Sequence, residues 1–277
     1  MPLRHTNSAP TESTITNQVP NRLISGLAIA FSAILIWLIP RIALGTNWGL
    51  KNDTEAMNAV YAHSSVEADI LDALGIISIG TALVAVLVMV LLAMMRGRKR
   101  VALGILVLVG GANITAQLLK HQVLVRPNTI DNLQNSLPSG HTTLVVTLAL
   151  GAIAVAPRGF RYSAVFGASL LATLTGASTV VAGWHRPADI FAALAIGFFW
   201  GAIVTFVLGW HNNYGPGATA SAALAGALIA GIFLIAIGVR PTGGWEGFTD
   251  AALVFSAMGG ATALTMAAFA RMITPHP

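Results

Sequence analysis

Gly183 to Asp189 reads Gly-Trp-His-Arg-Pro-Ala-Asp and lies between two long apolar runs. Ionisable side chains are costly at the edge of an apolar segment unless they face water or have a function. Pro187 favours the first turn of a helix, and Asp189 would lie in that turn, close enough to hold the imidazole of His185. A carboxylate that orients an imidazole is a common way to prepare a nucleophile or a base. His185 and Asp189 are therefore the first candidates for chemistry.

The composition around this stretch is that of a membrane protein. Hydrophobic residues make up 55% of the 277 residues and charged residues 9%, against about 25% charged in an average soluble domain. The formal net charge is +5, but the basic residues form short clusters beside apolar runs. That pattern fits the positive-inside rule of membrane proteins better than a nucleic-acid surface, so no nucleic-acid partner is expected. The absence of cysteine excludes disulfides, thiol nucleophiles and thiolate metal sites.

Eight apolar segments predict an all-α fold, a polytopic membrane helical bundle. The expected spans are residues 23–40, 70–95, 101–119, 139–156, 162–183, 187–210, 220–239 and 251–270. Basic residues after the second and fourth spans predict cytoplasmic loops there, so both termini would be cytoplasmic, with a bacterial plasma membrane as the expected location. A cleaved signal peptide is the alternative for the first span, and the long, weakly basic leading segment disfavours it.

The regions outside the spans have distinct compositions. Residues 1–21 are polar without an apolar period, which predicts a disordered cytoplasmic tail. In the acidic segment 46–72, Asn52 followed by Glu55 predicts the cap of a short surface helix carrying Met57, Val60 and Tyr61, and the sequence assigns it no function. We expect residues 22–210 to form a six-span core, and residues 211–277 to add two transmembrane helices.

Two polar loops, residues 120–138 and 184–186, are expected on the same outer face. Lys120 and Arg126 supply positive charge in the first loop. Pro138-Ser139-Gly140-His141 then opens the fourth span, with Ser139 as a good N-cap and Gly140 leaving the backbone open to a ligand. The free N–H groups of that first helical turn attract anions, and His141 could donate a proton there. Together with His185 and Asp189, this inventory suits a phosphate ester.

These residues resemble the three motifs of the type 2 phosphatidic acid phosphatase (PAP2) superfamily of membrane lipid phosphatases. The family motifs are Lys-x6-Arg-Pro, Pro-Ser-Gly-His and Ser-Arg-x5-His-x3-Asp. The second is complete at Pro138 to His141. The third is partly present as Ser178, His185 and Asp189, and the first appears as Lys120 followed by Arg126-Pro127. The resemblance covers about residues 20–210.

The resemblance implies a role for each matching residue. His185 would attack phosphorus and form a phosphohistidine, Asp189 would orient it, and His141 would protonate the leaving group. The phosphoryl oxygens would be bound by Lys120, Arg126, Ser139 and the Gly140 backbone. The implied partners are the bilayer and a lipid phosphate or diphosphate at the outer leaflet, and no cofactor or metal would be needed.

Two departures from the motifs leave alternatives open. Five residues, not six, separate Lys120 from Arg126, and Thr179 occupies the position of the third motif's arginine. A hydroxyl does not replace a guanidinium that binds two phosphate oxygens, so Arg186 is the candidate substitute cation. The alternatives are a PAP2-like binding or scaffold protein with a degraded site, and a lipid phosphotransferase. The absence of ionisable residues near any span centre disfavours a transporter.

Overall fold

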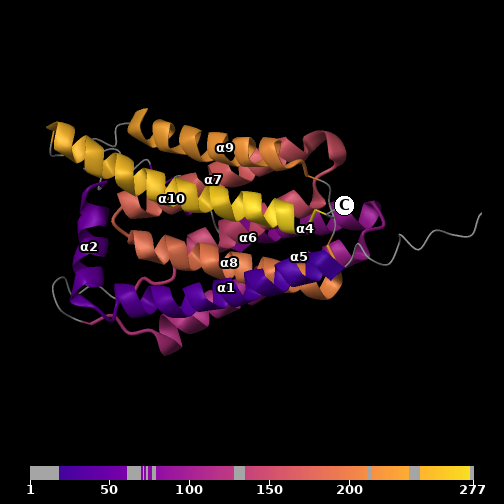
Figure 1. Cartoon of the computed structure of the whole chain (residues 1–277), viewed down its shortest axis with the longest axis horizontal. Coiled ribbons are helices and arrows are strands. Elements are labelled where there is room, and N and C mark those ends of the chain that lie inside the picture. Colours follow the sequence, from indigo (N-terminus) through magenta and orange to yellow (C-terminus); the bar gives the residue numbers. More distant parts are fainter. Residues whose placement is uncertain are drawn as a thin grey trace, which may run out of the picture.

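A computed structural model describes residues 19–60, 70, 72, 74–76, 79–127, 135–210, 214–236 and 244–274 of the chain. Within these ranges the regular structure is entirely helical, which confirms the expected all-α class (Figure 1). The predicted tail lies outside the described residues as far as residue 18, and its last three residues already belong to the first helix.

Eight apolar helices correspond in order to the eight expected spans. They are α1 (Val19–Ala43), α4 (Ile79–Met95), α5 (Lys99–Leu118), α6 (Gly140–Val155), α7 (Arg161–Val181), α8 (Pro187–Leu208), α9 (Pro216–Ala236) and α10 (Gly244–Met272). Among the described residues, six of these are long and apolar enough to cross a membrane, and α4 and α6 are shorter. A π-helical turn, η2 (Leu119–Val123), continues α5, and a 3-10 turn, η3 (Arg158–Phe160), precedes α7.

Helix α8 lies at the centre of the bundle, where it packs against α1, α5, α6 and α10 (Figure 1). Small residues permit this close packing. A Cβ atom on Gly197 would lie 2.6 Å from the Val146 side chain, and one on Gly201 would lie 3.0 Å from Phe269. In a membrane, where lipid tails are as apolar as the helices, such close backbone approach is a main source of helix association.

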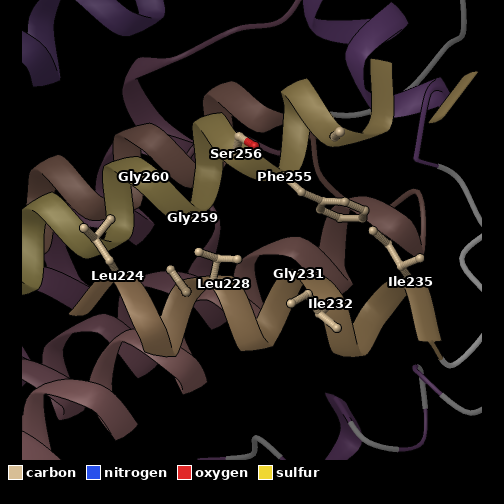
Figure 2. A pocket seen from close by; sticks show the side chains of 11 residues that line it. Leu224, Leu228, Gly231, Ile232, Ile235, Phe255, Ser256, Gly259 and Gly260 are labelled. Atoms are coloured by element: carbon tan, nitrogen blue, oxygen red, sulfur yellow. The ribbon is translucent and has the colours of Figure 1, made fainter. Parts of the chain in front are cut away.

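Helices α9 and α10 pack against α7 and against each other. A groove of about 320 Å³ runs between them, and Figure 2 shows Leu228 and Ile232 of α9 beside Phe255 and Gly259 of α10. None of the residues that line this groove is ionisable. The C-terminal pair therefore extends the apolar bundle.

Helix α2 (Asn47–Asn58) crosses one end of the bundle, roughly perpendicular to the long helices (Figure 1). Thr46 caps it by accepting a hydrogen bond from the Gly49 backbone N–H at 2.9 Å. Its buried residues, Gly49, Asp53 and Met57, are spaced four apart and form one face, which packs on α1, α8 and α10. A helix is thus present in this segment, but its cap is Thr46 instead of Asn52, and it ends at Asn58, before Val60; Tyr61 lies outside the described residues. The helix carries a buried carboxylate to the end where α8 begins.

Candidate active site

The start of α8 holds a buried histidine–carboxylate pair. His185 Nδ1 lies 2.9 Å from Asp189 Oδ2, and both side chains are buried. The same carboxylate oxygen accepts a hydrogen bond from the Arg186 backbone N–H at 3.1 Å, as the third residue of a capped helix often does. An ionised carboxylate can only accept, so Nδ1 of His185 carries a proton, and in the neutral imidazole Nε2 is then the nitrogen with the free lone pair. This is the arrangement of an oriented nucleophile or base.

The start of α6 is tied directly to the first turn of α8. Ser139 is the N-cap of α6, and its hydroxyl accepts hydrogen bonds from the backbone and side chain of Thr142. The Ser139 backbone N–H donates to the Asp189 carbonyl at 3.1 Å. The helix that carries Gly140 and His141 therefore begins beside the His185–Asp189 pair.

A pocket of about 700 Å³ opens beside these helix starts. Its polar end contains Lys120 of η2, Gly140 and His141 of α6, and His185. The remaining lining residues are mostly apolar and come chiefly from α4, α5 and α6: Ile79, Ala82, Leu83, Val86, Val109, Gly110, Asn113, Ile114, Gln117, Leu144 and Trp184. The pocket therefore joins a cationic, histidine-bearing end to an apolar wall.

Lys120 reaches the pocket although its spacing from Arg126 departs from the family motif. It lies in the π-helical turn η2, and π-helical turns are frequent at functional sites. His141 packs against Trp184, with ring centroids 5.8 Å apart and ring planes tilted by 34°. Trp184 also lines the pocket, although it was not among the candidate site residues.

Arg126 lies next to Asp189 and is not among the residues that line the pocket. Its Nη2 atom is 3.6 Å from Asp189 Oδ1, and the arginine side chain is only 4% exposed. Among the described residues, neither Nε nor Nη2 of Arg126 has a hydrogen-bond partner. Burial lowers the pKa of Arg126, the charge of Arg186 lowers it further, and Asp189 opposes both. A buried guanidinium with unused donors is suited to bind an anion, because unpaired buried donors are costly.

Thr179, which occupies the position of the family arginine, and Arg186, its candidate substitute, are also buried. Thr179 Oγ1 donates to the Gly176 carbonyl at 2.8 Å, and the Thr179 carbonyl accepts from the backbone N–H groups of Trp184 and His185. Thr179 therefore shapes the turn that delivers His185. Arg186, the candidate substitute cation, donates from Nε to Thr54 Oγ1 of α2 at 3.2 Å. Neither residue is among those that line the pocket.

Asp53 of α2 is the buried carboxylate that sequence reasoning did not assign to the site. Its Oδ1 accepts a hydrogen bond from the Ala188 backbone N–H at 2.9 Å, across 135 positions of sequence. Burial raises the pKa of Asp53 to about 6, and the charge of Asp189 adds to this, whereas the Ala188 bond and the two arginines oppose it. Within the described ranges, no group of three or more histidine, cysteine, aspartate or glutamate side chains could hold a metal ion.

Comparison with known proteins gives one family match, over part of the chain. A family model described as the PAP2 superfamily matches residues 102–213, from α5 to just beyond α8. All the motif residues from Lys120 to Asp189 lie inside this match. Searches of curated proteins and of solved structures gave no match. Residues 102–213 of this chain are therefore similar to the PAP2 superfamily, in agreement with the resemblance of its motifs.

Proposed function

We propose that this protein is a membrane phosphatase that hydrolyses a lipid phosphate or diphosphate through a phosphohistidine on His185. One observation carries the proposal: His185, held by Asp189, opens into a pocket that has Lys120 and His141 at one end and apolar side chains along its wall. The match of residues 102–213 to the PAP2 superfamily supports a phosphatase-type activity on phosphate esters.

The pocket suits a substrate with a charged head and an apolar tail. Leu83 of α4 and Ile114 of α5 line it and are 64% and 62% exposed on the surface of the bundle, where lipid would lie. An acyl or prenyl chain can therefore extend along these helices while its phosphate meets the histidines. Such a division between an apolar wall and a few convergent polar groups is typical of ligand sites.

In the first half-reaction, Nε2 of His185 attacks phosphorus and the bond to the leaving oxygen breaks. Protonated His141 donates its proton to that oxygen, which departs as the alcohol, or as the lipid monophosphate when the substrate is a diphosphate. Asp189 stabilises the positive charge that develops on the His185 imidazole. Lys120, Arg126 and the first N–H groups of α6 offset the charge on the phosphoryl oxygens.

In the second half-reaction, water replaces the histidine on phosphorus. Neutral His141 removes a proton from the water as its oxygen attacks, and the bond between phosphorus and Nε2 breaks. Inorganic phosphate is released, His185 regains its lone pair, and His141 is protonated again. Each group thus returns to its starting state, with one water consumed per turnover.

The distribution of basic residues supports an orientation for the site. Arg96, Arg98, Lys99 and Arg100 follow α4, so they lie at the end of the bundle opposite the start of α6. Under the positive-inside rule that basic end is cytoplasmic. We therefore place the pocket's polar end at the extracytoplasmic face, with both termini in the cytoplasm.

Release of inorganic phosphate by the purified protein tests the proposal. A suitable panel contains phosphatidic acid, phosphatidylglycerol phosphate and a polyprenyl diphosphate, with His185→Ala as the control. We expect release by the wild type and none by the variant. Equal release by both would refute the mechanism. Transfer of the phosphoryl group to an added alcohol would identify a phosphotransferase, which uses the same residues.

Thr179 favours one second candidate, a PAP2-like binding protein without turnover. Its hydroxyl is committed to the Gly176 carbonyl, so it supplies nothing in place of the family arginine. If Arg186 supplies the missing charge instead, Arg186→Ala should abolish turnover, and Arg186→Lys should not restore it, because an ammonium cannot reproduce a guanidinium fork. Binding of the lipid phosphates without release by the wild type would establish the second candidate.

A further inference from the structure

Two neighbouring residues of α2 hold the first turn of α8 from outside that helix. Asp53 Oδ1 accepts from the Ala188 backbone N–H at 2.9 Å, and Thr54 Oγ1 accepts from Arg186 Nε at 3.2 Å. The N–H groups of a first helical turn have no partner within their own helix. Asp53 of α2 thus supplies, from another part of the chain, the hydrogen-bond acceptor that a local N-cap side chain usually supplies.

The His185–Asp189 pair belongs to this same turn. Ala188 is bonded to Asp53, and the next residue, Asp189, bonds to His185 Nδ1 at 2.9 Å. A displacement at Ala188 would therefore move the carboxylate that orients the imidazole. Misplacement of a reacting group by about 1 Å can lower a rate by roughly 100-fold, even when the change lies away from the chemistry.

The burial of Asp53 has no evident benefit for packing alone. Asp53 is 9% exposed, and its Oδ2 has no hydrogen-bond partner among the described residues. The charged groups that act on it are Asp189 of α8, Arg126 after η2 and Arg186 before α8. A buried, incompletely paired carboxylate beside such a cluster is a functional-site candidate.

We propose that Asp53 is a positioning residue, which anchors the start of α8 through Ala188 and thereby keeps Asp189 and His185 in reactive geometry, with Thr54 as its partner on Arg186. This inference rests on the proposed phosphatase function. It assigns to α2, which lies outside the matched family segment, a role in the rate of the chemical step. Asp53 does not line the pocket, so it should affect kcat more than KM.

The experiment compares Asp53→Ala, Asp53→Asn, Thr54→Val and, as a matched control, Glu55→Gln. The Asn variant keeps an oxygen that can accept from Ala188, whereas the Ala variant does not. Glu55 is on the same helix, and its side chain is 60% exposed. Each purified variant is assayed for kcat and KM on the lipid phosphate that the wild type hydrolyses best, and hydrogen exchange is measured on the peptide that spans the start of α8.

We expect Asp53→Ala to lower kcat by about 10- to 100-fold with little change in KM. Asp53→Asn should retain most of kcat, Thr54→Val should lose several-fold, and Glu55→Gln should match the wild type. Exchange at the start of α8 should accelerate in Asp53→Ala and less in Asp53→Asn. The proposal that Asp53 anchors the start of α8 would be overturned if Asp53→Ala kept the wild-type kcat. It would also be overturned if Asp53→Asn lost as much kcat as Asp53→Ala.

Two further outcomes separate this inference from the proposed function. If the wild type releases no phosphate, the phosphatase proposal fails, while exchange at the start of α8 still reports whether Asp53 anchors that turn. If Asp53→Ala does not fold, unchanged kcat and unchanged exchange in Thr54→Val would still overturn the inference, whereas a loss of kcat with faster exchange would support it.

Discussion

Asp189 connects most of the candidate site through one carboxylate. Its Oδ2 accepts from His185 and from the Arg186 backbone, and its Oδ1 lies 3.6 Å from Arg126 Nη2. In the proposed mechanism, the orientation of His185 and the charge of Arg126 therefore both depend on this side chain. Asparagine, the neutral isostere, would keep the shape of Asp189 but would lose both the negative charge beside His185 and the negative charge opposite Arg126.

We expect Asp189→Asn to lower kcat by about 10³- to 10⁴-fold, because an amide can hold the imidazole in the wrong tautomer and cannot stabilise its positive charge. Steady-state kinetics of the purified variant would measure the loss. A variant that retains a tenth or more of the wild-type kcat would show that His185 does not act as an Asp-oriented nucleophile.

The spacing of residues predicted His185 and Asp189 as a pair because both belong to one helix start. Lys120 and His141 were predicted at the same outer face, and they do line one pocket with His185. The Asp53–Ala188 contact could not be predicted, because 135 positions separate the two residues and no periodic pattern connects them. The Arg186–Thr54 bond was equally invisible, since nothing local in the sequence connects the two residues.

At the scale of the element, α2 places the carboxylate of Asp53 where burial makes its negative charge unfavourable. The pKa of Asp53 is raised from 3.8 to about 6, which corresponds to about 3 kcal/mol favouring the protonated form in the folded state. Below pH 4 the group is protonated in both folded and unfolded chains, so it has no effect on stability. As the pH rises from about 4 to about 6, the unfolded chain loses this proton first, and stability falls.

We therefore expect Asp53→Asn to raise the melting temperature relative to the wild type, by an amount that grows between pH 4 and pH 6 and is constant above pH 7. Thermal denaturation of both proteins in one detergent over this pH range would measure the difference. A difference that does not vary with pH would mean that Asp53 is ionised freely in the folded protein.

Helices α7 and α9 approach so closely that one position tolerates no side chain. A Cβ atom on Gly226 would collide with the Phe166 carbonyl oxygen and would lie 2.9 Å from the Leu170 nitrogen. These are backbone atoms, which cannot rotate away. The sequence predicted α9 as a span but could not show which of its glycines faces a neighbour, because its apolar residues are distributed around the whole helix.

We expect Gly226→Ala to destabilise the protein by about 1–3 kcal/mol, as overpacking typically does. Gly217→Ala is the matched control, because it lies on the same helix and a Cβ there meets nothing within 4 Å. Melting temperatures of the two variants in detergent provide the comparison. Equal stability of both variants would mean that α9 does not lie against α7 as described.

At the scale of the whole molecule, hydropathy predicted the helical class and the order of the helices because each span must satisfy its backbone hydrogen bonds internally. Hydropathy could not predict which apolar side chains would line a pocket between the helices. The apolar side chains of Ile79 and Leu83 read only as part of a span, although they form a wall of the pocket. The distribution of charge, in contrast, makes a prediction for the orientation of the entire bundle.

The chain contains no cysteine, so single introduced cysteines can report this orientation. We expect Lys51→Cys on α2 to react with a membrane-impermeant maleimide added outside intact cells, because α2 crosses the end that holds the pocket's histidines. Lys99→Cys, at the start of α5, should react only after the membrane is permeabilised. The opposite pattern of labelling would place the site in the cytoplasm.

The apolar wall between α4 and α5 also determines where the two reaction products would go. Its exposed rim, which includes Leu83 and Ile114, would face hydrocarbon in a membrane, whereas His185 directly precedes the turn of α8 that α2 contacts. A dephosphorylated lipid would diffuse away in two dimensions within its leaflet, and inorganic phosphate would disperse in three dimensions through the aqueous phase. Resynthesis would require both to return at once from separate phases, so dilution alone would drive the reaction forward.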